Sequence, residues 1–426
     1  MNSLILYPFQ EHILNQTIGR DHVAYFCDMG LGKTFIGAEK IKQLDNWLNL
    51  VVCQKSKIND WVEHFENFYP EFEVFDLTKN LDVFMHTYEF YTKPIIGVVN
   101  YDLIFRREAF LILEDFTLLL DESSLIQNER ARRTNFILKM KPKNIILLSG
   151  TPTGGKYENL WSQLHLLGWS ISNKAYEQNY VNWKKIEVGG FPIRIVDKSN
   201  PYKNVDRLKK KLREHGAVFL KTEEVFDLPE QTIIEINISK SKEYEWFRNR
   251  RLITVDGKEL VGDDPLSFRL YSRMLCGHYN EEKLTAFRDI LQSTNDRLIV
   301  FYNFNAELEK LMVIIEGLEK PISIVNGLIK DLEAYENHDD SVTLVQYQAG
   351  AMGLNLQKAN KIIYFTPTDK SELFEQSKKR IHRIGQERPC FYYLLVCKNT
   401  VEDEEIFPLL GLRKRLTDDL FKGGSI

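Results

Sequence analysis

The chain has 426 residues, which exceeds the size at which one hydrophobic core keeps growing, so we expect two or three domains. Its 43% hydrophobic and 27% charged residues exclude a disordered chain. The sequence lacks an apolar run near the ~20 residues of a membrane span and an N-terminal signal peptide, so we expect a cytoplasmic protein. Five cysteines without a CxxC pair argue against zinc, and the net charge of −4 disfavours a polyanion partner unless a basic lining is local.

The first chemical signal is the segment DMGLGKT at 28–34, which follows the apolar run HVAYFC and precedes a helix-like sequence. A strand, a glycine turn, a lysine, a hydroxyl and a helix in this order build a phosphate cradle. Gly30 and Gly32 permit positive φ angles and a close backbone approach, so that N–H groups can face phosphate oxygens. The positive end of the helix dipole adds to this attraction.

Two side chains complete the predicted cradle. Lys33 supplies a positive charge for the outer phosphates, and the Thr34 hydroxyl supplies a ligand for Mg²⁺. The strict pattern has glycine where this chain has Cys27, so an ordinary tight turn between strand and helix is the alternative. Upstream, Gln10 could read an adenine edge or could simply be a polar residue at the start of a helix.

Two more buried strands are predicted at NLVVCQ and PIIGVVN. Lys55 and Ser56 follow the first of these strands and could touch a ligand. The second strand ends in Asn100 and is followed by Tyr101.

Acidic residues end the next predicted strand, TLLLDESS at 117–124. Two carboxylates above three leucines are costly to bury unless a cation or a substrate faces them. Asp121 can then hold Mg²⁺, and Glu122 can orient and deprotonate an attacking water, whereas the alternative is an acidic strand end on the surface. NIILLSGTP at 144–152 is a further strand. Strands that alternate with helices predict a doubly wound parallel sheet, with the site at the carboxyl ends of its strands.

The pattern changes between about 169 and 280, where aromatic and basic residues crowd together. Solvated helix faces explain any single lysine, but the clustering also suits a protrusion that faces nucleic acid. Gly189, Gly190 and the segment DGKELVGDDP are expected to be loops.

The last third repeats the alternation of strands and helices. Strands are predicted at RLIVFYNF, PISIVNG, SVTLVQ and KIIYFTP, and a glycine-rich loop follows the third of them. EQSKKRIHRIGQ at 375–386 is predicted as a helix that places Gln376, Arg380 and Arg383 on one face. This face is either a solvated surface or a pair of guanidinium groups directed at a bound triphosphate.

These segments together carry a family resemblance. They are LYPFQ, DMGLGKT, VVCQKS, VVNYDLI, LLLDESS, LLSGTP with ENLWSQL, FLKTEEVFDLPEQT, LIVFYNF, QAGAMGLNL and QSKKRIHRIGQ. In this order they resemble the motor of the SWI/SNF-type (Snf-two family) ATPases of helicase superfamily two. The resemblance implies an α/β fold of two RecA-like lobes with helical protrusions between them. We expect the first lobe at 1–225, with its insertion from about 169, and the second at 226–426, with its protrusion reaching about 280.

The resemblance also implies roles for individual residues. Gln10 matches the adenine-reading glutamine, and the residues that match the phosphate loop are Gly30, Gly32, Lys33 and Thr34. Asp121 and Glu122 match the carboxylates that hold magnesium and the attacking water. Arg380 and Arg383 match the arginines of the second lobe. Contacts with the nucleic-acid backbone are implied at Lys55, Ser56, Asn100, Tyr101, Asn326, Gly327, Gln348 and Gly350.

The chain departs from the family pattern at several positions. Ser124 stands where the family commonly has histidine, which puts in doubt how hydrolysis is coupled to the following motif. Gly154 and Gly155 replace the more usual asparagine, and Gln346 and Tyr347 stand where many members have small hydroxyl residues.

The sequence therefore predicts a DNA-dependent ATPase that uses ATP and Mg²⁺ and translocates on duplex DNA as a monomer, in bacterial or phage replication, repair or recombination. Two alternatives stay open. One is a helicase that separates strands of DNA or acts on RNA, and the other is a non-hydrolysing, ATP-gated DNA clamp.

Overall fold

The computed structural model describes residues 5–188, 191–350 and 354–422, and the chain forms two compact units. Unit 1 comprises the residues up to Val225 together with those from Leu416 onward, and unit 2 comprises Phe226–Arg415. Within the described ranges, the helices are too short or too polar to cross a membrane. Gly189, Gly190 and the part of the predicted glycine-rich loop at 351–353 lie outside the described residues.

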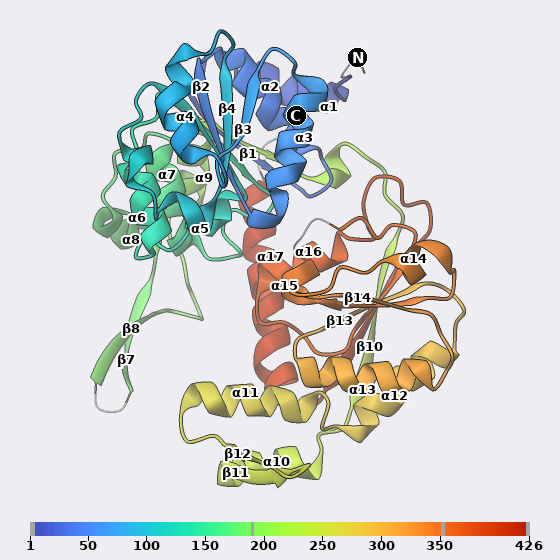
Figure 1. Ribbon diagram of the computed structural model, residues 1–426. Helices are drawn as coiled ribbons and strands as arrows, with labels where there is room; N and C mark the ends of the chain where they lie inside the picture. Colours follow the sequence, from blue (N-terminus) through green and yellow to red (C-terminus); the bar gives the residue numbers. More distant parts are fainter. Residues whose placement is uncertain (1–4, 189–190, 351–353, 423–426) are drawn as a thin grey trace. The chain divides into compact units, whose positions relative to one another are not determined.

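Unit 1 is built on a seven-stranded sheet (Figure 1). Its strands are, in spatial order, β3 (Glu73–Asp76), β4 (Ile95–Asn100), β2 (Leu48–Cys53), β5 (Phe116–Asp121), β6 (Asn144–Ser149), β1 (His22–Cys27) and β9 (Ala217–Leu220). All neighbouring strands in this sheet pair in parallel. Strands β2, β4 and β6 are buried at every residue, as expected for the near-continuous apolar runs of a parallel sheet.

Unit 2 contains a six-stranded sheet whose strands also pair in parallel. In spatial order the strands are β10 (Gln231–Ile238), β17 (Cys390–Cys397), β16 (Lys361–Tyr364), β13 (Leu298–Tyr302), β15 (Val342–Gln346) and β14 (Ile322–Val325). Parallel neighbours require crossover connections, which the intervening helices supply. The predicted fold class of two doubly wound, RecA-like lobes is therefore confirmed.

The helices follow the strands along the chain. Those of unit 1 are α1 (Pro8–Gln16), α2 (Lys33–Leu44), α3 (Ile58–Phe68), α4 (Leu81–Thr87), α5 (Tyr101–Ile104), α6 (Arg132–Lys139), α7 (Trp161–Leu166), α8 (Asn173–Tyr180) and α9 (Val205–Glu214). Those of unit 2 are α10 (Lys242–Arg250), α11 (Pro265–Cys276), α12 (Glu281–Gln292), α13 (Asn305–Glu316), α14 (Glu333–Asn337), α15 (Tyr347–Gly350) and α16 (Ser371–Lys378).

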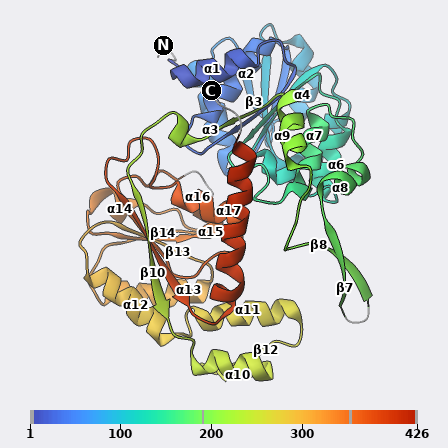
Figure 2. The same cartoon turned by 180° about the vertical axis from the view of Figure 1, so that it is seen from behind.

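The two regions predicted as helical protrusions each contain a β-hairpin as well as helices. In unit 1, β7 (Trp183–Val188) pairs antiparallel with β8 (Phe191–Val196), and this hairpin extends away from the rest of the unit in both views (Figures 1 and 2). In unit 2, β11 (Leu252–Val255) pairs with β12 (Lys258–Val261). The prediction that DGKELVGDDP is a loop is therefore wrong for β12. The sequence turns at Asp256 and Gly257, which both have positive φ angles, and then returns as a strand.

The last helix, α17 (Phe407–Phe421), begins in unit 2 and ends in unit 1. Leu420 and Phe421 are buried, and the Phe421 ring lies 5.3 Å from that of Phe219. The Lys221 ammonium lies 2.8 Å from an Asp418 carboxylate oxygen. The compact units therefore differ from the predicted lobe boundaries, which assigned every residue after 225 to the second lobe.

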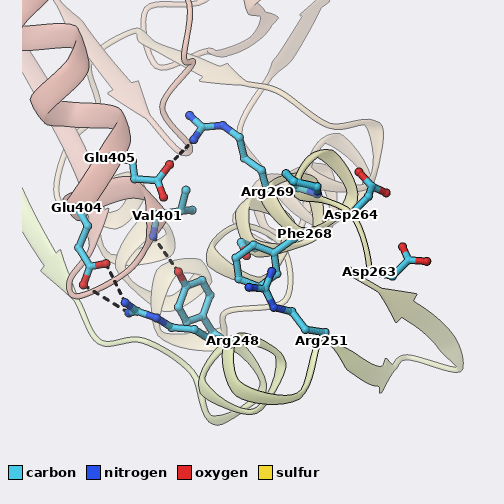
Figure 3. Close-up of a pocket in the computed structure, with 13 residues that line it drawn as sticks. Arg248, Arg251, Asp263, Asp264, Phe268, Arg269, Val401, Glu404 and Glu405 are labelled. Carbon is cyan, nitrogen blue, oxygen red and sulfur yellow. Dashed lines mark hydrogen bonds and ion pairs between the residues drawn. The ribbon is translucent and has the colours of Figure 1, made fainter. Parts of the chain in front are cut away.

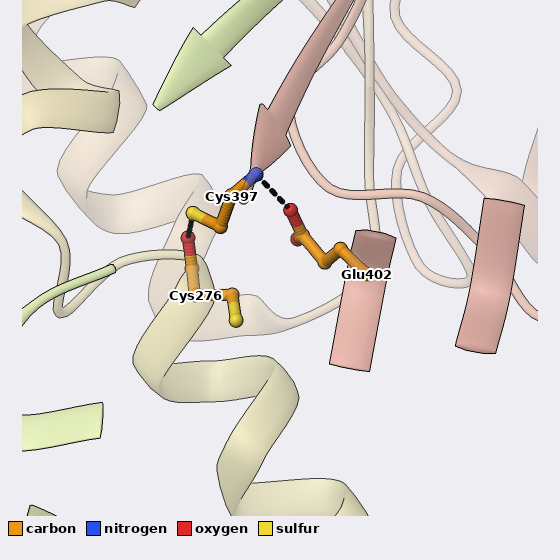
Figure 4. A group of neighbouring side chains, drawn as sticks. All are labelled: Cys276, Cys397 and Glu402. Atoms are coloured by element: carbon orange, nitrogen blue, oxygen red, sulfur yellow. Dashed lines mark hydrogen bonds between the residues drawn. The ribbon is translucent and has the colours of Figure 1, made fainter. Parts of the chain in front are cut away.

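A charged pair, Lys283 and Glu402, is enclosed in the core of unit 2. Figure 4 shows Glu402 with the two neighbouring thiols, Cys276 and Cys397. Lys283 Nζ donates to both Glu402 carboxylate oxygens, at 2.8 and 2.7 Å, and both side chains are at most 1% exposed. The ligand atoms of Cys276, Cys397 and Glu402 lie within 4.8 Å of one another, as they would around a metal ion. Because the Lys283 ammonium already neutralises this carboxylate, we assign the cluster to the core.

Removal of the Lys283 charge should destabilise the protein. We expect Lys283→Met to lower the free energy of unfolding by about 3–5 kcal/mol, because Glu402 would be left buried without a cation. Urea unfolding would measure this loss. The control is Glu404→Gln, since Glu404 pairs with Arg248 at 3.1 Å across side chains that are nearly half exposed, and such pairs contribute about 0–1 kcal/mol. Equal small losses in both variants would contradict this account of the buried pair.

Candidate nucleotide site and nucleic-acid contacts

The predicted phosphate cradle lies at the carboxyl end of β1. Gly30 and Gly32 have φ angles of 86° and 68°, which favour glycine, and α2 begins at Lys33. Lys33 Nζ donates to the backbone oxygens of Cys27 at 3.0 Å and Asp28 at 3.2 Å. Gly32 holds the N-cap position without a side-chain cap, so the first N–H groups of α2 are not capped by its side chain. This arrangement suits an anion.

Gln10 belongs to the same site. Its Oε1 accepts a hydrogen bond from the Tyr7 amide at 2.9 Å, and its Nε2 donates to the Leu31 oxygen in the cradle at 3.1 Å. A Cβ atom added to Gly32 would lie 2.4 Å from Gln10 Nε2, so a side chain at position 32 would displace the Gln10 amide, and the positive φ angle favours glycine there as well. The structure thus brings the predicted adenine-reading residue against the phosphate loop.

The two predicted catalytic carboxylates follow at the end of β5. Asp121 Oδ2 accepts a hydrogen bond from the Trp61 indole at 2.9 Å. Burial raises the pKa of Asp121, and the Trp61 hydrogen bond and the Lys33 charge oppose that rise. Glu122 has a φ angle of 53°, a left-handed conformation that is uncommon outside glycine and frequent at functional sites.

Trp61 is the site residue that the sequence did not reveal. The spacing in α3 predicts a core position, and Trp61 is indeed only 1% exposed. Its indole N–H nevertheless reaches a carboxylate 60 residues away in the sequence, a pairing that the helical pattern does not signal.

The segment LSGTP lies against the cradle. A Cβ atom added to Gly150 would lie 3.4 Å from both the Cys27 oxygen and Lys33 Nζ. The end of β6 therefore borders the lysine that the sequence assigns to the outer phosphates.

The predicted helix at 375–386 is confirmed only as far as Lys378 and is wrong for the residues after it. Helix α16 ends at Lys378, and the chain continues in tight turns, in which the Arg380 amide donates to the Ser377 oxygen at 3.2 Å. Gly385 has a φ angle of 92°, and Gln386 Nε2 donates to three backbone oxygens, of which the closest is Ala359 at 2.8 Å. These contacts hold the segment in a folded turn and are incompatible with a continuous helix.

Gln376, Arg380 and Arg383 consequently do not share a helix face. Arg380 is 5% exposed, and its Nη1 contacts the Leu354 oxygen at 3.5 Å. Arg383 is partly exposed, and burial lowers the pKa of its guanidinium from the ordinary value. Arg383 is therefore the more accessible of the two arginines.

The residues predicted to contact nucleic acid in unit 1 fall into two groups. Lys55 and Ser56 are exposed just beyond β2. Asn100 and Tyr101 are 4% and 2% exposed, and the Tyr101 hydroxyl donates to the backbone oxygen of Asp121 at 2.9 Å. Tyr101 is therefore tied to the backbone at the end of β5, and its predicted contact with nucleic acid stays a prediction.

In unit 2, the corresponding residues lie at the ends of β14 and β15. Asn326 Oδ1 accepts hydrogen bonds from the amides of Leu328 at 2.9 Å and Ile329 at 2.8 Å, so its side chain shapes the turn. Gly327 and Gln348 are exposed, and Gly350 ends α15.

A separate pocket of about 750 Å³ lies in unit 2, between α10, α11 and the turn after β17 (Figure 3). Arg248 and Arg269 pair with Glu404 and Glu405, and the Arg251 guanidinium lies 3.6 Å from the centre of the Phe268 ring. The arginines that line this pocket are thus engaged by the protein itself. The predicted site residues lie elsewhere.

Comparison with known proteins identifies the family. The SNF2-related domain model matches residues 22–281, and the model of the helicase conserved C-terminal domain matches residues 282–385. A solved structure, the Sulfolobus solfataricus SWI2/SNF2 ATPase core in complex with dsDNA, is also similar. The match covers 99% of this chain and 94% of the solved chain, with 20% sequence identity and a TM-score of 0.45.

Curated relatives span eukaryotes and bacteria. A SWI/SNF-related regulator of chromatin, subfamily A member 1, from Mus musculus is 23% identical over 94% of this chain and 41% of the relative. The putative ATP-dependent helicase/translocase YwqA of Bacillus subtilis is 22% identical over 98% of this chain and 49% of the relative. The chain thus spans about half or less of these relatives. The two family models together cover most of the sequence. The chain belongs to the SNF2-related family, with a helicase conserved C-terminal domain as its second part.

Proposed function

We propose that this protein hydrolyses ATP in a DNA-dependent manner and translocates on duplex DNA. The observation that carries the proposal is the convergence of the Lys33 cradle, the LSGTP segment and the Asp121 carboxylate at the ends of β1, β6 and β5. The carboxyl ends of parallel strands are where such sheets bind ligands. Lysine, backbone N–H groups and a carboxylate are the groups that a nucleoside triphosphate with its metal requires.

The residues present fit Mg²⁺. Burial raises the pKa of Asp121, and a nearby dication would reverse this effect by favouring the ionised carboxylate. Asp121 and the Thr34 hydroxyl supply the oxygen ligands that Mg²⁺ prefers. When bound, the ion would neutralise charge on the phosphate oxygens.

The remaining site residues divide the work of hydrolysis. Lys33 binds the outer phosphates, and Gln10 borders the base. Glu122 takes a proton from the attacking water at its carboxylate. Arg380 and Arg383 of the second lobe stabilise the charge that develops on the terminal phosphate, by analogy with the family.

Contacts with DNA are proposed for the exposed residues Lys55, Ser56, Gly327 and Gln348, with Asn100, Asn326 and Gly350 supporting the adjoining backbone. ATP binding would close the two lobes on DNA and hydrolysis would release them, which moves the motor along the duplex. The name of the Bacillus subtilis relative, a helicase/translocase, supports this proposal. A role in bacterial or phage replication and repair, and a monomeric state, stay predictions.

Two displacement assays test translocation against strand separation. We expect the protein, with ATP and Mg²⁺, to displace the third strand of a DNA triplex, because a motor that tracks the duplex backbone removes whatever lies in its path. A forked duplex without a third strand should stay paired. Separation of the fork without displacement of the triplex would overturn the proposal in favour of a helicase.

A further inference from the structure

The buried side-chain amide of Gln163 joins the segment after Asp121 and Glu122 to the LSGTP segment. Ser123, the first residue of the short helix η4 (Ser123–Ile126), donates through Oγ to Gln163 Oε1 at 2.9 Å. Gln163 lies in α7, and its Nε2 donates to the Pro152 oxygen at 2.7 Å. The side chains of Ser123 and Gln163 are both fully buried.

The two ends of the Gln163 amide have different hydrogen-bonding roles. A glutamine side chain offers an acceptor at one atom and donors at the other, so a single residue can satisfy both a hydroxyl and a carbonyl. In a buried position, the loss of either partner leaves a polar group without a hydrogen bond and carries the full cost of desolvation. The link therefore fixes the distance between Ser123 and Pro152.

A second amide reinforces the Pro152 end. Gln127 Nε2 donates to the same Pro152 oxygen at 3.1 Å, and Asn159 Nδ2 donates to Gln127 Oε1 at 2.9 Å. The Pro152 carbonyl is thus held by two side chains, one from α7 and one from just after η4. These contacts hold the LSGTP segment in a set position relative to η4.

Both ends of the link border the proposed chemistry. Ser123 directly follows Glu122, whose φ angle is 53°. A left-handed conformation at a non-glycine residue persists only where the surrounding structure holds it. Pro152 lies two residues after Gly150, the position that borders Lys33 Nζ. The buried cross-link at this point is made by Ser123 and not by Ser124, the residue that replaces the family's histidine.

We infer that Gln163 is a positioning residue that sets the orientation of Glu122 relative to the phosphate cradle. This inference rests on the proposed function, since it assigns Gln163 a role in ATP hydrolysis. Gln163 does not touch the nucleotide, and it acts through Ser123 on one side and Pro152 on the other.

The test compares steady-state ATP hydrolysis, with saturating duplex DNA, in Gln163→Met, Ser123→Ala and the double variant. Methionine keeps the length of the side chain and removes both hydrogen bonds. We expect kcat to fall about tenfold or more in each single variant, since small misplacements of a catalytic group have effects of this size or larger. The KM for ATP and the affinity for duplex DNA should change by less than about twofold, because binding groups stay in place. The double variant should be no slower than the single variants.

Ser162→Ala is the matched control. Ser162 lies beside Gln163 in α7, is 1% exposed, and donates to the Ile126 oxygen at 2.6 Å. This variant loses one buried hydrogen bond and should lower the melting temperature, yet its kcat should stay within about twofold, because its bond does not reach Pro152.

The outcomes separate this inference from the proposed function. If the unsubstituted chain lacks ATP hydrolysis, the proposed function and this inference both fail. If it hydrolyses ATP and the folded Gln163→Met variant keeps its kcat, Gln163 is structural only and the inference is overturned. Losses in the single variants that multiply in the double variant would also overturn it. Should Gln163→Met fail to fold, Ser123→Ala, a smaller change, decides the question by the same criterion.

Discussion

Replacement of Arg383 by alanine should lower the rate of ATP hydrolysis by at least about a thousandfold, while ATP and duplex DNA still bind. Phosphoryl transfer leaves little covalent chemistry to the protein, so catalysis depends on position and on stabilising the charge of the transition state. An arginine supplied to that charge contributes about 10³ to 10⁵ in rate, or about 4–7 kcal/mol. An arginine on a solvated surface contributes at most about 1 kcal/mol. Single-turnover hydrolysis at saturating ATP measures the difference.

The location of Arg383 favours it over Arg380 for this role. Arg380 is 5% exposed and contacts a backbone oxygen, whereas Arg383 keeps part of its surface accessible. Arg388→Ala is a suitable control, since Arg388 is exposed in the same segment and its Nη2 donates to the Lys358 oxygen. The control should retain most activity. A loss of less than about fivefold in Arg383→Ala would place Arg383 on a solvated surface and remove it from the mechanism.

Lys33→Ala should reduce ATP hydrolysis by about a thousandfold and leave the fold intact. Lys33 Nζ donates to two backbone oxygens of its own loop, so its charge is held at the centre of the cradle. A preorganised charge in a partly buried site stabilises the phosphate oxygens far more than it would in water, and removal of a single such donor typically costs about 10² to 10³ in rate. Turnover assays together with circular dichroism check both halves of this prediction.

The control for Lys33 is Lys42→Ala in the same helix. Lys42 pairs with Glu71 at 2.8 Å, and its side chain is 53% exposed, so its removal should leave hydrolysis nearly unchanged. If Lys33→Ala hydrolyses ATP as fast as the unsubstituted protein, the glycine turn at 28–34 is an ordinary connection between a strand and a helix.

The sequence predicted most inner strands of both sheets and the edge strand β14, but it did not predict the edge strands β3, β9 and β10 or the inner strand β17. Strands β2, β4 and β6 are buried at every residue and therefore read as continuous apolar runs. Two of the four edge strands, β3 and β10, do not have this signature. The residues of β3 are only half buried, and those of β10 alternate between exposed and half buried along most of its length. An edge strand has only one neighbour, so its composition is less constrained.

The prediction from helical spacing was wrong where glycine and side-chain hydrogen bonds to the backbone hold the chain in turns. The charged residues at 375–386 have helical periodicity, but Gly385 and the three backbone contacts of Gln386 hold the segment in turns. A glycine two residues after the expected arginine face was the available signal for an earlier helix end.

The sequence likewise predicted some contacts of the candidate site and missed others. Motif order placed Lys33, Asp121 and Glu122 at strand ends, because parallel strands share one carboxyl edge. The contacts of Gln10 with Leu31 and of Trp61 with Asp121 join residues 21 and 60 positions apart. Such pairs depend on how α1 and α3 pack against the sheet, and local periodicity carries no information about them.

The most direct test of the central claim is the rate of ATP hydrolysis, with Mg²⁺, in the absence and in the presence of duplex DNA. The proposed function predicts that the protein hydrolyses ATP and that duplex DNA accelerates hydrolysis, with the accelerated rate lost in Glu122→Gln, which retains the shape of Glu122 but cannot accept the proton of water. ATP binding without turnover under both conditions would contradict the claim and identify a nucleotide-gated clamp instead.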